Sequence, residues 1–402
     1  MKKFLIITFV FSLFFLTGCD NDTGKSGYEI FPETIELMLS QAEVEMERNF
    51  MPGMTVAFVD LDSGFTWTQG FGYADTVRGI PVIDETIFNM ASISKPFTAI
   101  ALMQLVEQGL IDLDEPITTY LPEFSMLPHP EYGGNYQNIT IRMLLNHTAG
   151  IPRDYGAFER NLDGLGDTNW SFVGGNIQGL ETYADIMFMG SLNSHQPEYM
   201  NHLLTNISAL TMEFTEGIRF KYSNLGYTIL GILIASVSGS DNYFEGFIGH
   251  MNEHILAPAQ MNESTFVMTE EFTSFMAMPY LNALLGQEEV LFVNALSTGG
   301  LFSTAKDMAR FMHIILASDG IFLCDEYLRK MFDFGEIEYG LGFMPMGTDA
   351  IGHTGFWQHS STMLLNLEYG LGVFIAVNSG DSPTLFADMI LASAIEERNT
   401  IE

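Results

Sequence analysis

The chain is poor in cysteine for its length. Among its 402 residues only Cys19 and Cys324 carry a thiol, so no disulfide framework can be inferred. Cys324 stands in the apolar segment 321–324, where a cysteine behaves as a small hydrophobic side chain. We therefore predict that Cys324 is buried and unreactive.

Basic side chains are also scarce. Lysine and arginine number 16 against 50 acidic residues, which gives a formal net charge of −34. Nucleic acids and anionic lipid surfaces are bound through clustered Lys and Arg, so this balance argues against both as partners. The sequence also lacks internal repeats and long low-complexity tracts. With 47% hydrophobic residues, it can bury a sizeable core.

The most apolar stretch lies at the amino terminus. Two lysines precede a run that reaches Leu16, which is too short to span a bilayer comfortably and has the flanks of a secretory signal. The run ends in L-T-G-C at Cys19, which resembles a bacterial lipobox, where the cysteine is lipidated. We predict a lipoprotein signal peptide over residues 1–19, a polar tether over 20–31, and a lipid anchor on Cys19. An ordinary cleaved signal or a signal anchor is the alternative.

Hydrophobic patterning in the body of the chain places strands near both ends and a helical, loop-rich stretch from about 110 to 297. Strands at both ends imply one sheet assembled from the two termini, with a second subdomain beside it and a site in the groove between them. The pattern predicts helices over 32–50, 92–108 and 385–396, and strands over 54–60, 65–73, 340–343, 361–367 and 372–377.

A serine and a lysine stand at a suggestive spacing where the second of these helices begins. Ser92 precedes Lys95 by three residues, and positions i and i+3 share one helix face, so the hydroxyl and the amine can meet. A serine hydroxyl needs an adjacent base to become a nucleophile. A lysine serves when burial or a neighbouring cation lowers its pKa. This spacing also occurs on solvated helices, so its value depends on partners elsewhere in the chain.

Two later stretches carry polar groups suited to the same chemistry. The sequence Y-S-N at 222–224 puts a phenol, a hydroxyl and an amide at the head of a second apolar helix. The sequence H-T-G at 353–355 precedes a strand. The first of these could equally cap a helix, since Asn and Ser favour such positions. The order of the three motifs favours the catalytic interpretation.

In this order, S-x-x-K, Y-x-N and a variant of K-T-G mark the serine β-lactamase and penicillin-binding-protein superfamily. The chain resembles its branch of class C β-lactamases, DD-carboxypeptidases and esterases. Flanking stretches at 109–116, 144–152 and 339–343 resemble that branch too, and the resemblance extends from about residue 50 to the last helix.

The resemblance implies an α+β fold of the β-lactamase/transpeptidase-like type. An antiparallel sheet from both termini would be flanked by helices, with a mostly helical subdomain beside it. We expect the hydrolase domain over 32–400, its α/β part over about 32–109 and 298–400, and the helical subdomain over about 110–297.

The resemblance also implies a role for each matching residue. Ser92 attacks a carbonyl and forms an acyl-enzyme, and Lys95 hydrogen-bonds to it and eases its deprotonation. Tyr222 assists as a phenolate or a proton shuttle, and whether Lys95 or Tyr222 is the base stays open. Asn224 would hold the acyl-side amide of the substrate. The backbone N–H groups of Ser92 and Phe356 would form the oxyanion hole.

The third motif departs from the lysine that most β-lactamases carry. His353 takes that place ahead of Thr354 and Gly355, and we predict that all three bind substrate. A histidine titrates near neutral pH and offers a less constant charge to a substrate carboxylate. Its presence favours a peptidase or an esterase over an efficient β-lactamase. Phe356 and Trp357 would add an apolar wall.

Residues 250–254 match the H-x-x-E-H zinc pattern, with His250 and His254 on one helix face. A third ligand at a convincing spacing is not evident, and the stretch resembles a peripheral helix of the superfamily. We therefore predict no metal site there, and the resemblance implies no cofactor.

Together these patterns predict an extracytoplasmic serine hydrolase, lipid-anchored on the periplasmic side of the cell membrane. It would act through an acyl-enzyme on a small peptide, amide or ester, as D-alanyl peptidases or β-lactamases do. A carboxylesterase of the same fold is one alternative, and a sensor that binds penicillin or muropeptides without turnover is another. The expected partners are the substrate and, through the anchor, the membrane. We expect the protein to be a monomer, and we expect no nucleic-acid partner.

Overall fold

The computed structural model describes residues 30–154, 157–160, 170–173, 204, 207–208, 210–282, 286–287, 296–347 and 349–401. The predicted signal peptide, Cys19 and nearly all of the predicted tether lie outside these ranges. A search of the described helices for one apolar and long enough to cross a bilayer finds none.

Strands and helices are spread along the whole described chain. The strands are β1 Gly53–Asp60, β2 Phe65–Asp75, β3 Ile80–Pro81, β4 Phe88–Asn89, β5 Ala157–Arg160, β6 Trp170–Val173, β7 Tyr280–Asn282, β8 Gly286–Gln287, β9 Phe302–Ser303, β10 Met344–Met346, β11 Ala350–Phe356, β12 Ser360–Asn366 and β13 Leu371–Val377. The α-helices are α2 Pro32–Arg48, α3 Ser94–Glu107, α4 Ile141–Leu145, α7 Asn224–Val237, α8 Tyr243–Met251, α9 Glu270–Thr273, α10 Leu296–Gly299, α11 Ala305–Ala317, α12 Asp325–Met331 and α13 Thr384–Ile401. Short 3-10 turns cover η1 Ala91–Ile93, η2 Ile117–Thr119 and η3 Tyr136–Asn138, and a π-helical turn, η4, covers Asn252–Leu256.

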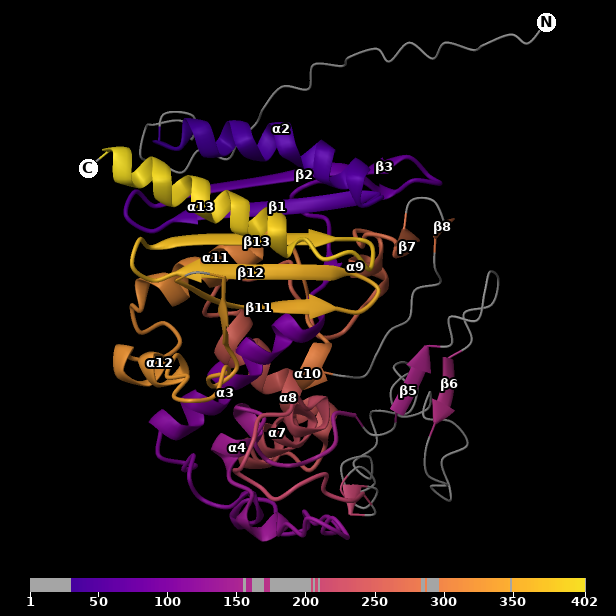
Figure 1. The fold of residues 1–402 in the computed structure, drawn as a ribbon, viewed down its shortest axis with the longest axis vertical. Helices are drawn as coiled ribbons and strands as arrows, with labels where there is room; N and C mark the ends of the chain where they lie inside the picture. Colours follow the sequence, from indigo (N-terminus) through magenta and orange to yellow (C-terminus); the bar gives the residue numbers. More distant parts are fainter. Residues whose placement is uncertain are drawn as a thin grey trace, which may run out of the picture.

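A seven-stranded antiparallel sheet organises the fold, in the order β10-β11-β12-β13-β1-β2-β3 (Figure 1). Its centre joins the two ends of the chain, because β1 pairs with β13 and places Met54 opposite Val377. The predicted antiparallel sheet built from both termini is thereby confirmed, and so is the α+β class.

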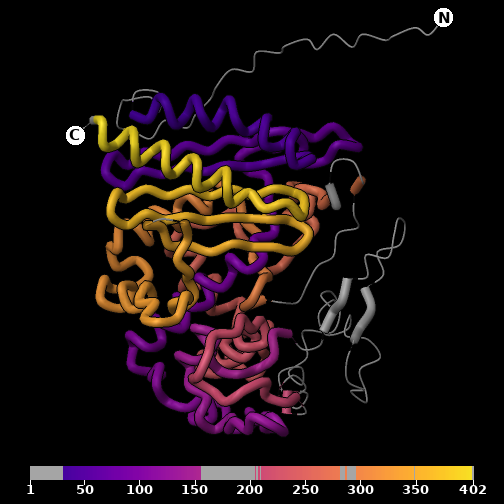
Figure 2. The backbone as a smooth tube through the Cα atoms, viewed as in Figure 1, coloured from indigo at the N-terminus to yellow at the C-terminus, as the bar shows by residue number. Residues whose placement is uncertain are grey.

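Strands β1 and β13 are buried on both faces of the sheet, and their residues alternate between two cores. In β1, Met54, Val56 and Phe58 face one core, while Ala57 and Val59 face the other. The first core lies under α2 and α13, which pack against each other. Figure 2 shows these two helices, from the indigo start and the yellow end of the chain, side by side. The second lies under α11 and continues into the helical part.

Helix α3 lies in the middle of that second core. Nearly all of its side chains are buried, which agrees with a sequence that is apolar on every face. It packs against α7, α8 and α10. Gly109 follows it with φ +70°, as expected of the glycine that closes a helix.

Three sequence-based expectations about local structure are wrong. Residues 340–343 are not a strand, and the H-T-G motif lies inside strand β11 instead of before one. Cys324 is exposed, because it is the residue before α12, where the apolar segment turns out to solvent. The region between 110 and 297 also contains two short strand pairs, β5–β6 and β7–β8, that the sequence pattern did not indicate.

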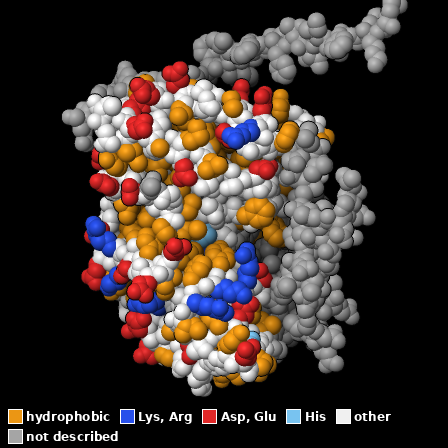
Figure 3. All heavy atoms as spheres, viewed as in Figure 1, with side chains coloured by type: hydrophobic (Ala, Val, Ile, Leu, Met, Phe, Trp, Pro, Cys, Tyr) orange, Lys and Arg blue, Asp and Glu red, His pale blue; other side chains and the backbone are white. Residues whose placement is uncertain are grey.

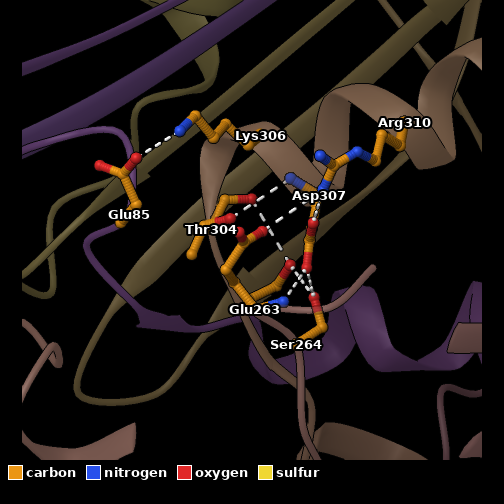
Figure 4. Close-up of polar contacts among 8 residues, drawn as sticks. Glu85, Glu263, Ser264, Thr304, Lys306, Asp307 and Arg310 are labelled. Carbon is orange, nitrogen blue, oxygen red and sulfur yellow. Dashed lines mark hydrogen bonds and ion pairs between the residues drawn. The ribbon is translucent and has the colours of Figure 1, made fainter. Parts of the chain in front are cut away.

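A polar network ties α11 to the segment after η4 (Figure 4). The Asp307 carboxylate is fully buried and accepts hydrogen bonds from the Glu263 backbone N–H and the Ser264 hydroxyl, both at 2.8 Å. It also pairs with Arg310 one turn along the helix. Thr304 caps the helix by accepting from the Asp307 N–H at 3.3 Å. Every oxygen of this buried carboxylate therefore has a donor.

We expect Asp307→Ala to lower the free energy of unfolding by about 3 kcal/mol, because it leaves several donors without their acceptor. Urea unfolding followed by circular dichroism measures this. Glu85→Gln is the matched control, because Glu85 pairs with Lys306 on the same helix but is partly exposed, and its loss should cost less than about 1 kcal/mol. Equal effects of the two substitutions would contradict the structural role given to Asp307.

Candidate active site

Ser92 and Lys95 meet at the start of α3. Ser92 lies in the 3-10 turn η1 and Lys95 in the first turn of α3, so the serine precedes the α-helix instead of opening it as predicted. In a 3-10 turn, side chains at i and i+3 eclipse each other. The Lys95 Nζ accordingly lies 3.1 Å from the Ser92 Oγ.

Bonds from neighbouring elements hold this turn in place. Ser94 donates its hydroxyl to the Ala91 carbonyl at 2.7 Å and accepts from the Leu301 N–H at 3.0 Å. Ala91 itself has φ +45°, an unusual value for a residue with a side chain. Gly355 of β11 lies so close that a Cβ there would be 2.1 Å from the Met90 carbonyl oxygen. The glycine of the H-T-G motif thus lets the sheet approach the serine turn.

The Lys95 amine is buried and held by two carbonyl oxygens. Nζ lies 2.8 Å from Asn224 Oδ1 and 2.8 Å from the Thr298 backbone oxygen, in addition to its contact with Ser92. Burial lowers the pKa of Lys95 well below its ordinary value, an effect that the Asp154 carboxylate opposes and the Arg153 guanidinium reinforces. The neutral amine is therefore far more accessible near neutral pH than in a solvated lysine.

Tyr222 covers the same amine. The centre of its ring lies 4.8 Å from the Lys95 Nζ, and its hydroxyl is buried. Burial raises the pKa of Tyr222 well above its ordinary value, and the Ser92 hydroxyl and Arg153 only partly offset this. The side chain is therefore a neutral phenol and not a phenolate.

Asn224 is positioned by the amino terminus of α7. Ser223 is the N-cap residue and accepts from the Gly226 N–H at 2.9 Å. The Asn224 amide oxygen accepts from Lys95 and from the Thr298 hydroxyl at 3.0 Å, and the amide nitrogen donates to Asp154 Oδ1 at 2.7 Å. The Y-S-N motif thus serves as a helix cap and supplies polar groups to the site at once.

His353 is near the site, but its ring is enclosed. The residue is 2% exposed, its Nδ1 lies 2.6 Å from the Thr354 carbonyl oxygen, and its Nε2 lies 2.8 Å from the Tyr339 hydroxyl. Because a carbonyl only accepts, Nδ1 carries the proton and Nε2 accepts from the phenol. Burial and the nearby Lys95 lower the pKa of His353 to about 3. The structure therefore does not support the predicted contact between the His353 ring and a substrate.

The edge of β11 completes the site. Strand β10 pairs only with residues 350–352, so residues 353–356 have no strand on their outer side within the described ranges. Thr354 is half-buried there, and Phe356 is 65% exposed at the end of the strand. The backbone that would supply the predicted oxyanion N–H of Phe356 is thus next to the serine turn, because β11 packs against η1.

An apolar ring and a guanidinium lie close to the residues of this site. Figure 3 shows hydrophobic side chains gathered across the middle of the face in view, with Lys and Arg side chains below them. Phe220 and Phe356 are among the exposed large hydrophobic residues, and the Arg153 guanidinium lies 5.5 Å from the centre of the Tyr222 ring. The mouth of the site is therefore partly apolar, with a cation beside Tyr222.

His250 and His254 lie close together, but no third possible metal ligand joins them within the described residues. The centres of their rings lie 4.5 Å apart, with the ring planes tilted by 47°, where α8 runs into the π-helical turn η4. His250 Nδ1 bonds to the Ser238 hydroxyl at 3.0 Å. Over the part of the chain that the structure describes, groups of three or more His, Cys, Asp or Glu side chains able to hold a metal ion do not occur.

Sequence reasoning missed three groups of the site. Thr298 acts through its backbone carbonyl, for which residue type gives no signal. Asp154 is the second residue after the flanking stretch 144–152, and Tyr339 opens the flanking stretch 339–343. Both stretches frame the motifs in the sequence, but a contact with Asn224 or His353 cannot be inferred from spacing.

Comparisons with known proteins identify the family of the chain. The family model named Beta-lactamase matches residues 42–395, so the chain belongs to the β-lactamase family. This is the superfamily of serine hydrolases and penicillin-binding proteins that the motifs resemble.

Curated relatives carry corresponding names. Penicillin-binding protein 4* of Bacillus subtilis (strain 168) is 25% identical over 81% of this chain and 68% of its own length. The mitochondrial serine beta-lactamase-like protein LACTB of Homo sapiens is 43% identical, but over only 25% of this chain and 18% of its own length. The chain thus spans about two thirds of the first relative and less than a fifth of the second.

Solved structures share the fold. An octameric penicillin-binding protein homologue from Pyrococcus abyssi has a TM-score of 0.67 at 25% identity, covering 90% of this chain and 77% of that one. A beta-lactamase/D-alanine carboxypeptidase from Pseudomonas syringae has a TM-score of 0.67 at 18% identity, covering 90% and 98%. These likenesses confirm the β-lactamase/transpeptidase-like fold.

The enclosed imidazole of His353 gives the fold a pH dependence. Its pKa is about 3 in the folded chain against 6.5 for an ordinary histidine, so unfolding takes up a proton between these values and stability is lost as the pH falls from 6.5. We expect His353→Gln to reduce the slope of unfolding free energy against pH in this window by up to about 1.4 kcal/mol per pH unit.

Urea unfolding at pH 4.5 to 7 tests this expectation. Measurements at pH 8 serve as the baseline, because the imidazole is neutral in both states there. If the variant and the parent chain show the same slope below pH 6.5, the buried neutral imidazole is not the cause.

Proposed function

We propose that the protein is a serine hydrolase that cleaves a small amide, peptide or ester through an acyl-enzyme on Ser92. The observation that carries this proposal is the contact of 3.1 Å between the Ser92 hydroxyl and a buried, desolvated Lys95 amine. A structural lysine in a fully buried position would be expected to pair with a carboxylate. This one bonds instead to two carbonyl oxygens and a serine.

The two carbonyl oxygens decide how the neutral amine is oriented. A neutral amine has two N–H groups and one lone pair, and the oxygens of Asn224 and Thr298 can only accept. Both N–H groups therefore point to them, and the lone pair points to the Ser92 hydroxyl. Lys95 is then the base that takes the serine proton while Oγ attacks a carbonyl.

Tyr222 supports this assignment of roles. Its raised pKa keeps the phenol protonated, so it suits the donation of a hydrogen bond or proton to the leaving group better than the role of base. The backbone N–H groups of Ser92 and Phe356 would stabilise the oxyanion, where losing one such donor costs around 3 kcal/mol.

A carboxylesterase is the second candidate, and two observations favour it. The ring of His353 is neutral and has both nitrogens bonded within the protein, so it offers no cation to a substrate carboxylate. The exposed Phe356 adds apolar surface at the mouth of the site. Such a site suits an uncharged ester.

We expect the parent protein, and not Ser92→Ala, to be labelled covalently by a fluorophosphonate probe and by a fluorescent penicillin. Gel fluorescence after denaturation measures the labelling, and near-identical circular dichroism spectra show that the variant is folded. Ser94→Ala is a control on the neighbouring serine, whose hydroxyl is bonded to Ala91 and Leu301, and it should keep the label site on residue 92. Mass spectrometry identifies the labelled residue, and labelling elsewhere would contradict the proposal.

Turnover assays then separate the substrate classes. Hydrolysis of p-nitrophenyl esters without release of D-alanine from a D-Ala-D-Ala peptide would assign the carboxylesterase. Release of D-alanine or opening of a β-lactam would assign the peptidase or β-lactamase type. Labelling of Ser92 without turnover of any of these would assign the sensor.

We also propose that the protein is held on the outer side of the cell membrane by lipid on Cys19. The lipobox-like L-T-G-C sequence supports this. Lipid chains would provide the membrane affinity that a chain of net charge −34 lacks.

Cells that express the full chain should incorporate a clickable fatty acid into it, and Cys19→Ala should abolish incorporation and release the protein from the membrane fraction. Cys324→Ala is the matched control, since it removes the other cysteine and should leave the label unchanged. Equal labelling of the Cys19→Ala variant would contradict the anchor.

A further inference from the structure

Residues 152–154 are fastened to the amino terminus of α7. The Ser223 hydroxyl donates to the Pro152 carbonyl at 2.6 Å, and the Asn224 backbone N–H donates to the Arg153 carbonyl at 2.7 Å. These bonds fix the backbone that carries Asp154 directly beside the Asn224 side chain. The resulting contact between Asp154 Oδ1 and Asn224 Nδ2 is 2.7 Å.

The Asp154 carboxylate determines which way the Asn224 amide faces. An ionised carboxylate only accepts hydrogen bonds, so the amide must present its nitrogen to Asp154. Its oxygen then faces the opposite way, toward Lys95 at 2.8 Å and the Thr298 hydroxyl at 3.0 Å. With the amide reversed, its N–H groups would oppose those of Lys95, and the carboxylate would face an oxygen.

We propose that Asp154 is a positioning residue for catalysis: through Asn224 it holds the Lys95 amine in the orientation that presents its lone pair to Ser92. Arg153, which pairs with Asp154 at 3.3 Å and lies over the Tyr222 ring, balances the charge of Asp154 toward the same amine. This inference rests on the proposed function, because it assumes that Lys95 serves Ser92 as a base.

Other titratable groups also face Lys95 from the elements around it. Tyr222 and Tyr227 of the α7 region present their rings at 4.8 and 5.5 Å from Nζ. Both are buried, and burial raises the pKa of each phenol, so they stay uncharged. His147 and His353 are also buried, and burial lowers the pKa of each imidazole, so they are neutral too. Arg153 and Asp154 therefore remain as the charged groups acting on Lys95 within the described ranges, with opposite signs.

The test measures the titration of Lys95 directly. The chain has only seven lysines, so protein labelled with [13Cε]lysine gives few resonances, and the loss of one in Lys95→Arg assigns Lys95. Asp154→Asn removes the negative charge but keeps an oxygen acceptor, Asp154→Ala removes both, and Arg153→Gln removes the positive charge. Glu326→Gln is the control, because it removes an exposed carboxylate of α12.

The titration midpoint of Lys95 should move to lower pH in both Asp154 variants and to higher pH in Arg153→Gln, and Glu326→Gln should leave it in place. A merely structural role of the 152–154 segment would not produce shifts of opposite sign. In the same set, Asp154→Ala should lower kcat for an ester by about ten- to a hundred-fold, and Asp154→Glu should restore part of it. Asp154→Asn should retain more activity than Asp154→Ala, because its oxygen can still receive the Asn224 N–H.

An unchanged Lys95 titration in a folded Asp154→Ala variant would overturn the inference, as would shifts of the same sign for both charged residues. The proposed function fails in a different way, through absent labelling of Ser92 in the parent protein. The titration reads the amine without any turnover, so the two failures are told apart.

Discussion

A single buried amine is the constraint on which the site depends. Placing Lys95 at 0% exposure is costly unless its N–H groups and its lone pair all find partners, and these partners come from three separate elements. Ser92 belongs to η1, Asn224 to the first turn of α7, and Thr298 to α10. The need to satisfy one lysine thus fixes the relative positions of the serine turn and both neighbouring helices. Any change that loosens one of these elements also disturbs the surroundings of this amine.

Close backbone approach is the second constraint, and it joins the sheet to this cluster. Gly355 lets β11 lie against Met90, and the same strand carries the enclosed His353. An imidazole bonded on both sides is a rigid spacer between β11 and Tyr339, which is buried too. In this chain the histidine of the H-T-G motif therefore stabilises the wall of the site, and the backbone of the strand edge is what remains available to a substrate.

Sequence patterns predicted the parts of the structure that depend on local order. The period of hydrophobic residues indicated α2, β1 and β2, and the ordered motifs indicated which side chains lie near Ser92. They could not show that His353 is enclosed. The position of its partner Tyr339 depends on the path of the loop before β10, which a sequence pattern does not give. Nor could they show the hydrogen bond between Asn224 and Asp154 or the one between Lys95 and the Thr298 carbonyl, since those contacts arise from tertiary packing. Cys324 was misjudged for a related reason: an apolar segment does not reveal which of its residues faces water.

The joining of both chain ends in one sheet has a consequence for how the protein folds. Strand β1 has β13 as a neighbour, and Thr34 bonds to Glu397, a residue 363 positions later. During synthesis the first strands emerge long before the partner that completes their edge, so the nascent chain carries an unpaired β-hairpin for most of translation. Such distant pairings slow folding, because a long loop must close before any contact is gained. Ser92, the proposed nucleophile, is encoded in the first quarter of the chain but acquires its surroundings only when the last strand has been added.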